Sequence, residues 1–177
     1  MMKIFEFAII ASGKDFEDDA FLDAVYEAGC DDATLSLQKG VIIADFSREA
    51  ISFSSAIASA CNQLLATGVK IERVEPDHLV SISEIAERSA LSRQAISLYS
   101  KGKRGKGFPG PIAKVTSSHP LWDWYQVARW LCEAGHIARE EVVYARVLKE
   151  ANIVLEANDV LQDGFAERLE RIELAAA

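Results

Sequence analysis

Residues 78–115, HLVSISEIAERSALSRQAISLYSKGKRGKGFPGPIAKV, decide how this chain of 177 residues is interpreted. Their first third predicts a short helix that runs to about Ser89, because Ser81 and Glu84 have the spacing of a capping box. Ser83 is an alternative N-cap for the same helix. Three apolar residues are expected to face inward, and the last of them is small enough for a steep crossing with a second helix: Ile82, Ile85 and Ala86.

A second helix follows the turn at Ala90-Leu91, with Ser92 as its N-cap and Arg93 as its first residue. The residues expected to pack inward are Ala95, Ile96 and either Leu98 or Tyr99. The residues left facing outward near the N-terminal end are Arg93, Gln94 and Ser97. Because arginine pairs with a guanine edge and glutamine with an adenine edge, these types suit contacts in the major groove of DNA. A helix N-terminus also favours a nearby phosphate.

The segment after the second helix is rich in glycine and in cations. Prolines at 109 and 111 favour an extended path there, since residues before proline avoid the helical region. We expect residues 102–114 to form a basic hairpin, or wing, whose cations contact phosphates or the minor groove. Such contacts supply affinity and salt dependence more than sequence discrimination. A solvated basic loop without a partner is the alternative.

Charge is unevenly distributed along the chain. The formal net charge is -8, yet residues 78–118 carry seven basic and two acidic residues, a net of +5. The remaining residues therefore carry a net charge of -13. This asymmetry indicates a patch that faces a polyanion on an otherwise acidic protein.

Residues 78–131 resemble the helix-turn-helix family in its MerR-like and excisionase-like winged-helix group. The residues that carry the likeness are Ser83-Glu84-Ile85-Ala86, Leu91-Ser92-Arg93-Gln94-Ala95-Ile96, Phe108-Pro109, Pro111, Leu121-Trp122, Val127 and Trp130-Leu131. The resemblance implies a recognition helix at about 92–101, the basic wing at 102–114, and then a helix that opens with an aromatic residue. Ala90 stands where the family often has glycine, which leaves the geometry of the turn open.

Residue types and resemblance together give the expected DNA-contacting set. It comprises Ser83, Ser92, Arg93, Gln94, Ser97, Lys101, Lys103, Arg104, Lys106 and Lys114.

Residues 1–76 predict a separate α+β domain. Alternating or apolar runs predict strands at 3–10, 33–38, 41–47 and 69–75, and helical spacing predicts helices within 15–29 and from 47 or 48 to about 65. Lys39-Gly40 is typical of a hairpin turn. The order βαββαβ is that of a ferredoxin-like sandwich, with two helices on one face of a four-stranded antiparallel sheet. We expect this domain to serve dimerisation or effector sensing, and to end at Pro76-Asp77.

The winged helix-turn-helix domain is expected at 77–135 and further helices at 136–177. Two apolar stripes on these last helices offer a dimer surface or pack onto the protein's own core, and the sequence leaves both open: Val143, Val147, Ala151, Val154 and Leu155, then Leu161, Phe165, Leu169 and Ile172. In LWDWYQVARWL, the residues expected to close the core are Leu121, Trp122, Val127 and Trp130. Trp124 is expected at the surface or in an interface.

No catalytic site, metal or cofactor is expected. The three histidines share no metal-ligand spacing, and no Ser/His/Asp or Cys/His arrangement stands out. The cysteines fit neither a disulfide framework nor a zinc pattern and are expected to be free thiols: Cys30, Cys61 and Cys132. The sequence has neither a membrane-spanning apolar run nor a secretory signal, so a cytoplasmic location is expected.

We therefore expect a bacterial-type transcriptional regulator that binds double-stranded DNA sequence-specifically as a homodimer. One alternative is an antitoxin whose acidic helical C-terminal segment wraps a basic toxin and which also represses its own operon. Another is an excisionase-like architectural protein that bends DNA. An enzyme built on the N-terminal domain is disfavoured, because the sequence offers no catalytic set.

Overall fold

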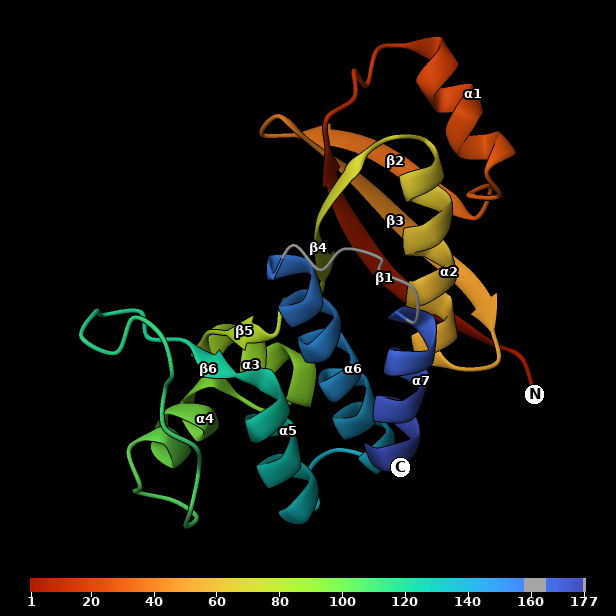
Figure 1. Ribbon diagram of the computed structural model, residues 1–177. Helices are drawn as coiled ribbons and strands as arrows, with labels where there is room; N and C mark the ends of the chain where they lie inside the picture. Colours follow the sequence, from red (N-terminus) through yellow and green to blue (C-terminus); the bar gives the residue numbers. More distant parts are fainter. Residues whose placement is uncertain (158–164, 177) are drawn as a thin grey trace. The chain divides into compact units, whose positions relative to one another are not determined.

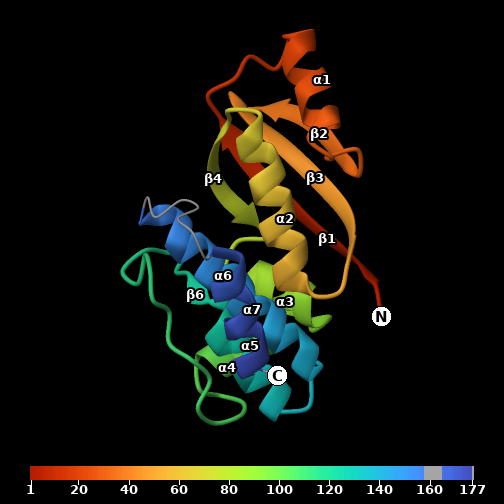
Figure 2. The same ribbon diagram turned by 45° about the vertical axis from the view of Figure 1, so that its right-hand side comes forward.

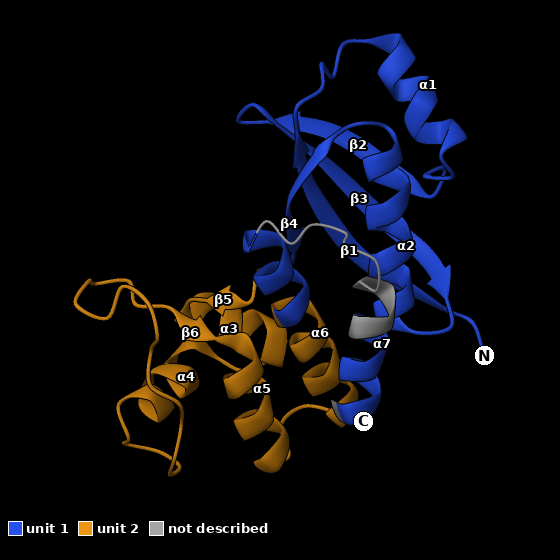
Figure 3. Ribbon diagram, viewed as in Figure 1, with its two compact units in different colours: residues 1–76, 150–175 blue, residues 77–149, 176–177 orange. Residues whose placement is uncertain are grey.

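The computed structural model describes residues 1–157 and 165–176. The chain divides into two compact units (Figure 3): unit 1 comprises Met1–Pro76 and Glu150–Ala175, and unit 2 comprises Asp77–Lys149 with the last two residues. The division after Pro76 lies where the sequence places a boundary. Residues 136–177 do not form a unit of their own, because one long helix begins in unit 2 and ends in unit 1.

Unit 1 contains a four-stranded antiparallel sheet in the order β2-β3-β1-β4. Its elements follow one another as β1 (Lys3–Ser12), α1 (Asp19–Glu27), β2 (Ala33–Gln38), β3 (Val41–Ala50), α2 (Phe53–Ala66) and β4 (Lys70–Glu75). The end of α6 (Arg139–Glu156) and most of α7 (Phe165–Ala176) also belong to this unit. The mixed α+β class and the antiparallel sheet are thus confirmed.

Alternation along the strands places the core of unit 1 on one face of the sheet. Alternate residues of β1 are buried, and their neighbours on the opposite face are half-buried or exposed. Helix α2 crosses the buried face in both views (Figures 1 and 2). Phe53, at its first turn, packs on Phe5 and Phe7 of β1, with ring centroids 5.6 and 6.1 Å away.

The predicted start of the second helix was wrong by five residues or more. Strand β3 continues to Ala50, because Arg48 and Ala50 extend the inward alternation and pair with β1. Helix α2 begins only after Ser52, whose side chain accepts from the Ser55 amide while Ser55 Oγ accepts from the Ser52 amide. The local apolar pattern of residues 47–52 fits either element, and the cross-strand pairing decides between them.

Arg48 joins three elements in the interior of unit 1. Its side chain is 7% exposed and forms a bidentate pair with Asp32, at 2.8 and 2.7 Å. It also donates to Ser59 and Gln63 of α2, at 3.1 and 2.6 Å, and to the Gly29 carbonyl at 3.2 Å. Burial opposes the charged guanidinium, but hydrogen bonding and the charge of Asp32 outweigh it and raise the pKa of Arg48.

The C-terminal helices complete unit 1 through polar contacts. Asn152 of α6 accepts from the Val74 amide at 2.8 Å and donates to the Val74 carbonyl at 2.9 Å, which occupies the free edge of β4. Glu173 of α7 accepts from the amides of Phe53 and Ser54 at the N-terminus of α2, at 3.2 and 3.1 Å. A carboxylate there is favoured by the helix dipole.

The first apolar stripe is covered within the single chain. Its members Val143, Val147, Ala151, Val154 and Leu155 are each at most 7% exposed. This is the alternative in which the stripe packs onto the protein's own core. In the second stripe Leu169 is buried and Ile172 is half-buried, whereas Leu161 and the side chain of Phe165 lie outside the described residues.

Unit 2 is mainly helical around a small antiparallel sheet. Its elements are β5 (Leu79–Val80), α3 (Ile82–Ser89), α4 (Arg93–Ser100), β6 (Trp122–Asp123), α5 (Trp124–Glu133) and the first part of α6. Strand β5 pairs with β6, and one further bridge joins Ala113 to Leu121. None of the helices in the described ranges has an apolar stretch long enough to span a bilayer.

The core of unit 2 gathers residues from all these helices. It comprises Val80, Ile85, Ala86, Ile96, Tyr99, Trp122, Trp124, Val127, Ala128, Leu131 and Ala145, with Leu91, Ala95, Phe108 and Trp130 among the half-buried residues packed against it. The expectation that Trp124 lies at the surface or in an interface was wrong: within the single chain it is 4% exposed, and the guanidinium of Arg88 lies over its ring. Asp123 caps α5 by accepting from the amides of Tyr125 and Gln126, so the ring of Trp124 belongs to the first helical turn.

Candidate nucleic-acid interface

A sharp turn, at which Ala90 has left-handed backbone dihedral angles, joins α3 to α4. Ser81 and Glu84 form the predicted capping box, in which each side chain accepts from the other residue's amide, at 3.3 and 2.7 Å. At the other end of α3, Ala90 has φ 54° and ψ 25°, and the Leu91 amide donates to the Ala86 carbonyl at 3.1 Å. The turn therefore keeps the geometry that usually favours glycine, although its residue carries a Cβ.

Helix α4 has one buried and one free face. Ile96 and Tyr99 are 0% and 5% exposed and belong to the core. Ser92 caps the helix by accepting from the Ala95 amide at 3.1 Å. Arg93 and Gln94 are exposed in the first turn, and within the described residues neither side chain makes a hydrogen bond or an ion pair. Two strong hydrogen-bonding groups are thus held outward by a capped helix and left for a partner.

A hollow of about 400 Å³ brings most of the predicted recognition residues together. Its walls come from the start of α3, the free face of α4 and the loop before β6, and its lining is Ser81, Ile82, Ser83, Arg93, Gln94, Ser97, Ser118, His119, Pro120 and Trp122. Ser83, Arg93, Gln94 and Ser97 were predicted from the sequence. Ser118 and His119 were not predicted from the sequence. Their segment carries no charge pattern, and the Ala113–Leu121 bridge beside it is seen only in the structure.

The hairpin is displaced from its predicted position. Backbone pairing joins Ile112 and Ala113 to Leu121, so the loop that the hairpin encloses is 114–120 rather than 102–114. Lys114, with φ 50°, is the cation at the start of that loop. The difference has a local cause: three glycines between 102 and 107 have positive φ and coil the chain, and Pro109 and Pro111 offer no amide for a strand ladder.

The other predicted cations stand in a separate loop directly after α4. Lys101, Lys103, Arg104 and Lys106 are all exposed. The structure therefore splits the predicted set into three: side chains around the hollow at the N-terminal end of α4, Lys114 in the loop 114–120, and the four cations beyond the C-terminal end of α4. Ser92 serves as the helix cap and lies next to the first group.

Comparison with known protein families, with curated proteins and with solved structures found no match for this chain. Within the described residues, no group of three or more histidine, cysteine or acidic side chains is placed to hold a metal ion. The features that bear on function are therefore the side chains themselves and the way in which α3, α4 and the two loops present them.

Proposed function

We propose that this protein binds double-stranded DNA sequence-specifically and regulates transcription, with α4 as the recognition helix in the major groove. The observation that carries the proposal is the free face of α4. Helix α4 packs one face into the core and turns Arg93 and Gln94 outward, where neither has a partner among the described residues. Both lie at the N-terminal end of the helix, the end that enters a groove in helix-turn-helix proteins. These two side chains suit guanine and adenine edges respectively.

The order of elements supports a winged-helix arrangement for unit 2. A strand, two helices, a short paired segment, a loop and a returning strand follow one another, and β5 pairs with β6 beside the Ala113–Leu121 bridge. In this arrangement the loop 114–120 is the wing. Ser118 and His119 line the same hollow as Arg93, so this wing would follow the DNA next to α4.

Unit 1 is proposed to be a ferredoxin-like domain that serves dimerisation or effector sensing. Its chain order βαββαβ and its strand order β2-β3-β1-β4 are consistent with that fold. A homodimer would present two recognition helices to half-sites one helical turn apart, which raises both affinity and specificity.

Selection of bound sequences from a random double-stranded library tests the proposal. The wild type and the Arg93→Ala/Gln94→Ala variant are compared at about 50 mM and about 200 mM salt, a range over which backbone contacts weaken strongly. We expect an enriched, two-fold symmetric site for the wild type and none for the variant. An equal enrichment in both proteins, or no binding of either at the lower salt, would overturn it.

A further inference from the structure

The loop after α4 is folded rather than extended. Gly102, Gly105 and Gly107 have φ of 65°, 66° and 75°. The amides of Lys103 and Arg104 both donate to the Leu98 carbonyl, at 2.9 and 3.2 Å, which turns the chain back over the end of the helix. The four cations of this loop are therefore carried by a backbone with defined turns.

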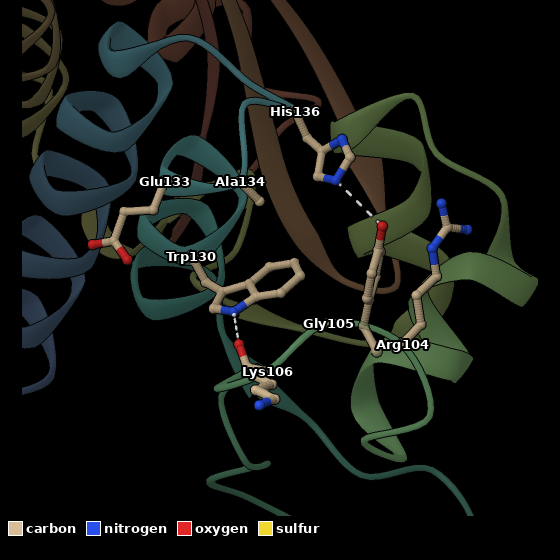
Figure 4. A pocket seen from close by; sticks show the side chains of 8 residues that line it. Arg104, Gly105, Lys106, Trp130, Glu133, Ala134 and His136 are labelled. Atoms are coloured by element: carbon tan, nitrogen blue, oxygen red, sulfur yellow. Dashed lines mark hydrogen bonds between the residues drawn. The ribbon is translucent and has the colours of Figure 1, made fainter.

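Trp130 of α5 holds the middle of this loop. Its indole Nε1 donates to the Lys106 carbonyl at 2.9 Å (Figure 4). Gly105 lies directly against the same ring: a Cβ added there would stand 2.9 Å from Trp130 Cζ2 and 3.2 Å from Tyr99 Cδ1. Only glycine fits this position without a shift, both because of the contact and because of its positive φ.

Aromatic rings fix Trp130 in turn. Its ring centroid lies 4.9 Å from that of Tyr99 and 5.1 Å from that of Phe108. The Tyr99 hydroxyl makes a hydrogen bond with His136 Nε2 at 3.3 Å, and the Arg104 guanidinium lies over the Tyr99 ring at 5.3 Å from its centroid. This packing connects the loop to the core of unit 2.

A hollow of about 480 Å³ opens between this loop and the end of α5. Its lining is Tyr99, Arg104, Gly105, Lys106, Trp130, Glu133, Ala134 and His136. Arg104 and Lys106 bring positive charge, and the amides of Gly105 and Lys106 make no hydrogen bond within the described residues. The one carboxylate of this lining, Glu133, lies 4.0 Å from Arg129, and in Figure 4 it points away from Trp130 and His136. Two cations in the lining of one hollow suit a phosphate.

We propose that this hollow is a preformed site for one phosphate of the DNA backbone, held by Arg104 and Lys106, with Trp130 and Gly105 as positioning residues. The inference rests on the proposed function and adds to it a defined anchor point beyond the recognition helix. Holding the loop backbone in advance reduces the entropic cost of ordering a glycine-rich loop on binding.

The first test compares Trp130→Phe with the wild type. The substitution keeps an aromatic ring and removes the donor to Lys106. Each phosphate contact contributes about 0.9 to the slope of log affinity against log salt. We therefore expect a slope smaller by up to about 0.9, with the preferred sequence unchanged, and the same loss in Arg104→Ala/Lys106→Ala. Combining the two variants should add little, because both remove one contact. An unchanged slope in Trp130→Phe, or full additivity, would overturn the proposal.

The second test observes the indole N–H of Trp130 by NMR in the intact wild type. Addition of duplex DNA should shift this signal, and the shift should be lost in Arg104→Ala/Lys106→Ala. A shift with inorganic phosphate but none with DNA would overturn the proposal in favour of a small anionic ligand. If Arg93→Ala/Gln94→Ala abolishes sequence preference while Trp130 neither shifts nor affects the slope, the proposed function stands and this inference fails.

Discussion

Arg48 of unit 1 and Arg93 of unit 2 show how differently one residue type is used in this chain. Arg48 is buried and engages a carboxylate, two side chains of α2 and a backbone carbonyl. Arg93 is exposed and has no partner among the described residues. The first arginine holds a domain together, whereas the second is free for a partner outside the chain. Position in the sequence distinguishes them poorly, because both follow a serine close to an element boundary.

The largest effect is expected from exchanging the two arginines for methionine separately. Arg48→Met leaves Asp32 without its bidentate partner, and breaking a buried pair costs roughly 3–5 kcal/mol. Arg93→Met changes an exposed position and should alter stability by less than about 0.5 kcal/mol. The stability lost by Arg48→Met is measured in unit 1, by hydrogen exchange of the β1 and β3 amides during urea unfolding. The stability change in Arg93→Met is measured in unit 2 by tryptophan fluorescence, because all three tryptophans lie there. Similar losses of stability in Arg48→Met and Arg93→Met would contradict the contrast between the two arginines.

A second prediction concerns the neutral neighbour of Arg93. Gln94→Ala should relax the preference at a single A·T pair of the selected site, by about 1–3 kcal/mol, because a bidentate amide contact is lost. The slope against salt should not change, since no charge is removed. Gln126→Ala is the matched control, because Gln126 is also an exposed glutamine near the start of a helix. Binding to single-base variants of the site measures both, and an unaltered preference in Gln94→Ala contradicts the assigned contact.

Substitutions of Ala90, in the turn before α4, are expected to change the stability of unit 2 through backbone conformation alone. Ala90 is exposed with φ 54°, so its side chain contributes strain without packing. Ala90→Gly should stabilise unit 2 by up to about 1 kcal/mol, and Ala90→Val should destabilise it by about 1–2 kcal/mol, since β-branched residues tolerate positive φ least. Urea unfolding, monitored by tryptophan fluorescence, ranks the wild type, Ala90→Gly and Ala90→Val by the stability of unit 2. The reverse order would mean that the turn is not held in this geometry in solution.

The smallest expected effect is on the chemical reactivity of the thiols near Arg48. Cys30 and Cys61 are buried, and burial raises the pKa of Cys61 to about 12 and raises that of Cys30 as well. Cys132 in unit 2 is half-buried. A thiol reagent at neutral pH should therefore modify only Cys132 in the folded protein and all three cysteines in urea. Rapid modification of Cys61 in the folded protein would show that the interior around Arg48 opens readily.

The elements of both units were largely predictable because their signals are local. Apolar or alternating runs predicted β1 to β4, the Lys39-Gly40 turn has positive φ at both residues, and the serine caps marked the starts of α3 and α4. The class and the four-stranded antiparallel sheet are confirmed. That α4 contacts DNA, that the chain forms a homodimer and that a toxin partner is an alternative all remain predictions.

What the sequence could not provide depends on contacts between distant residues. The side toward which Arg48 points is set by pairing with β1, and the position of the hairpin by a bridge between Ala113 and Leu121. Trp124 and Trp130 belong to one aromatic-rich stretch, yet one enters the core and the other holds a loop 24 residues earlier in the chain. Helical spacing alone assigns neither role.

The most direct test of the central claim compares two variants that each remove one cation, Arg93→Ala from α4 and Lys103→Ala from the loop. Affinity for the selected duplex and for a scrambled duplex of the same composition is measured across a range of salt. We expect Arg93→Ala to lose about 1–3 kcal/mol of discrimination between the duplexes. Lys103→Ala should keep the discrimination and reduce the slope against salt by up to about 0.9. Full discrimination in Arg93→Ala, or its loss in Lys103→Ala alone, would contradict the assignment of sequence reading to α4.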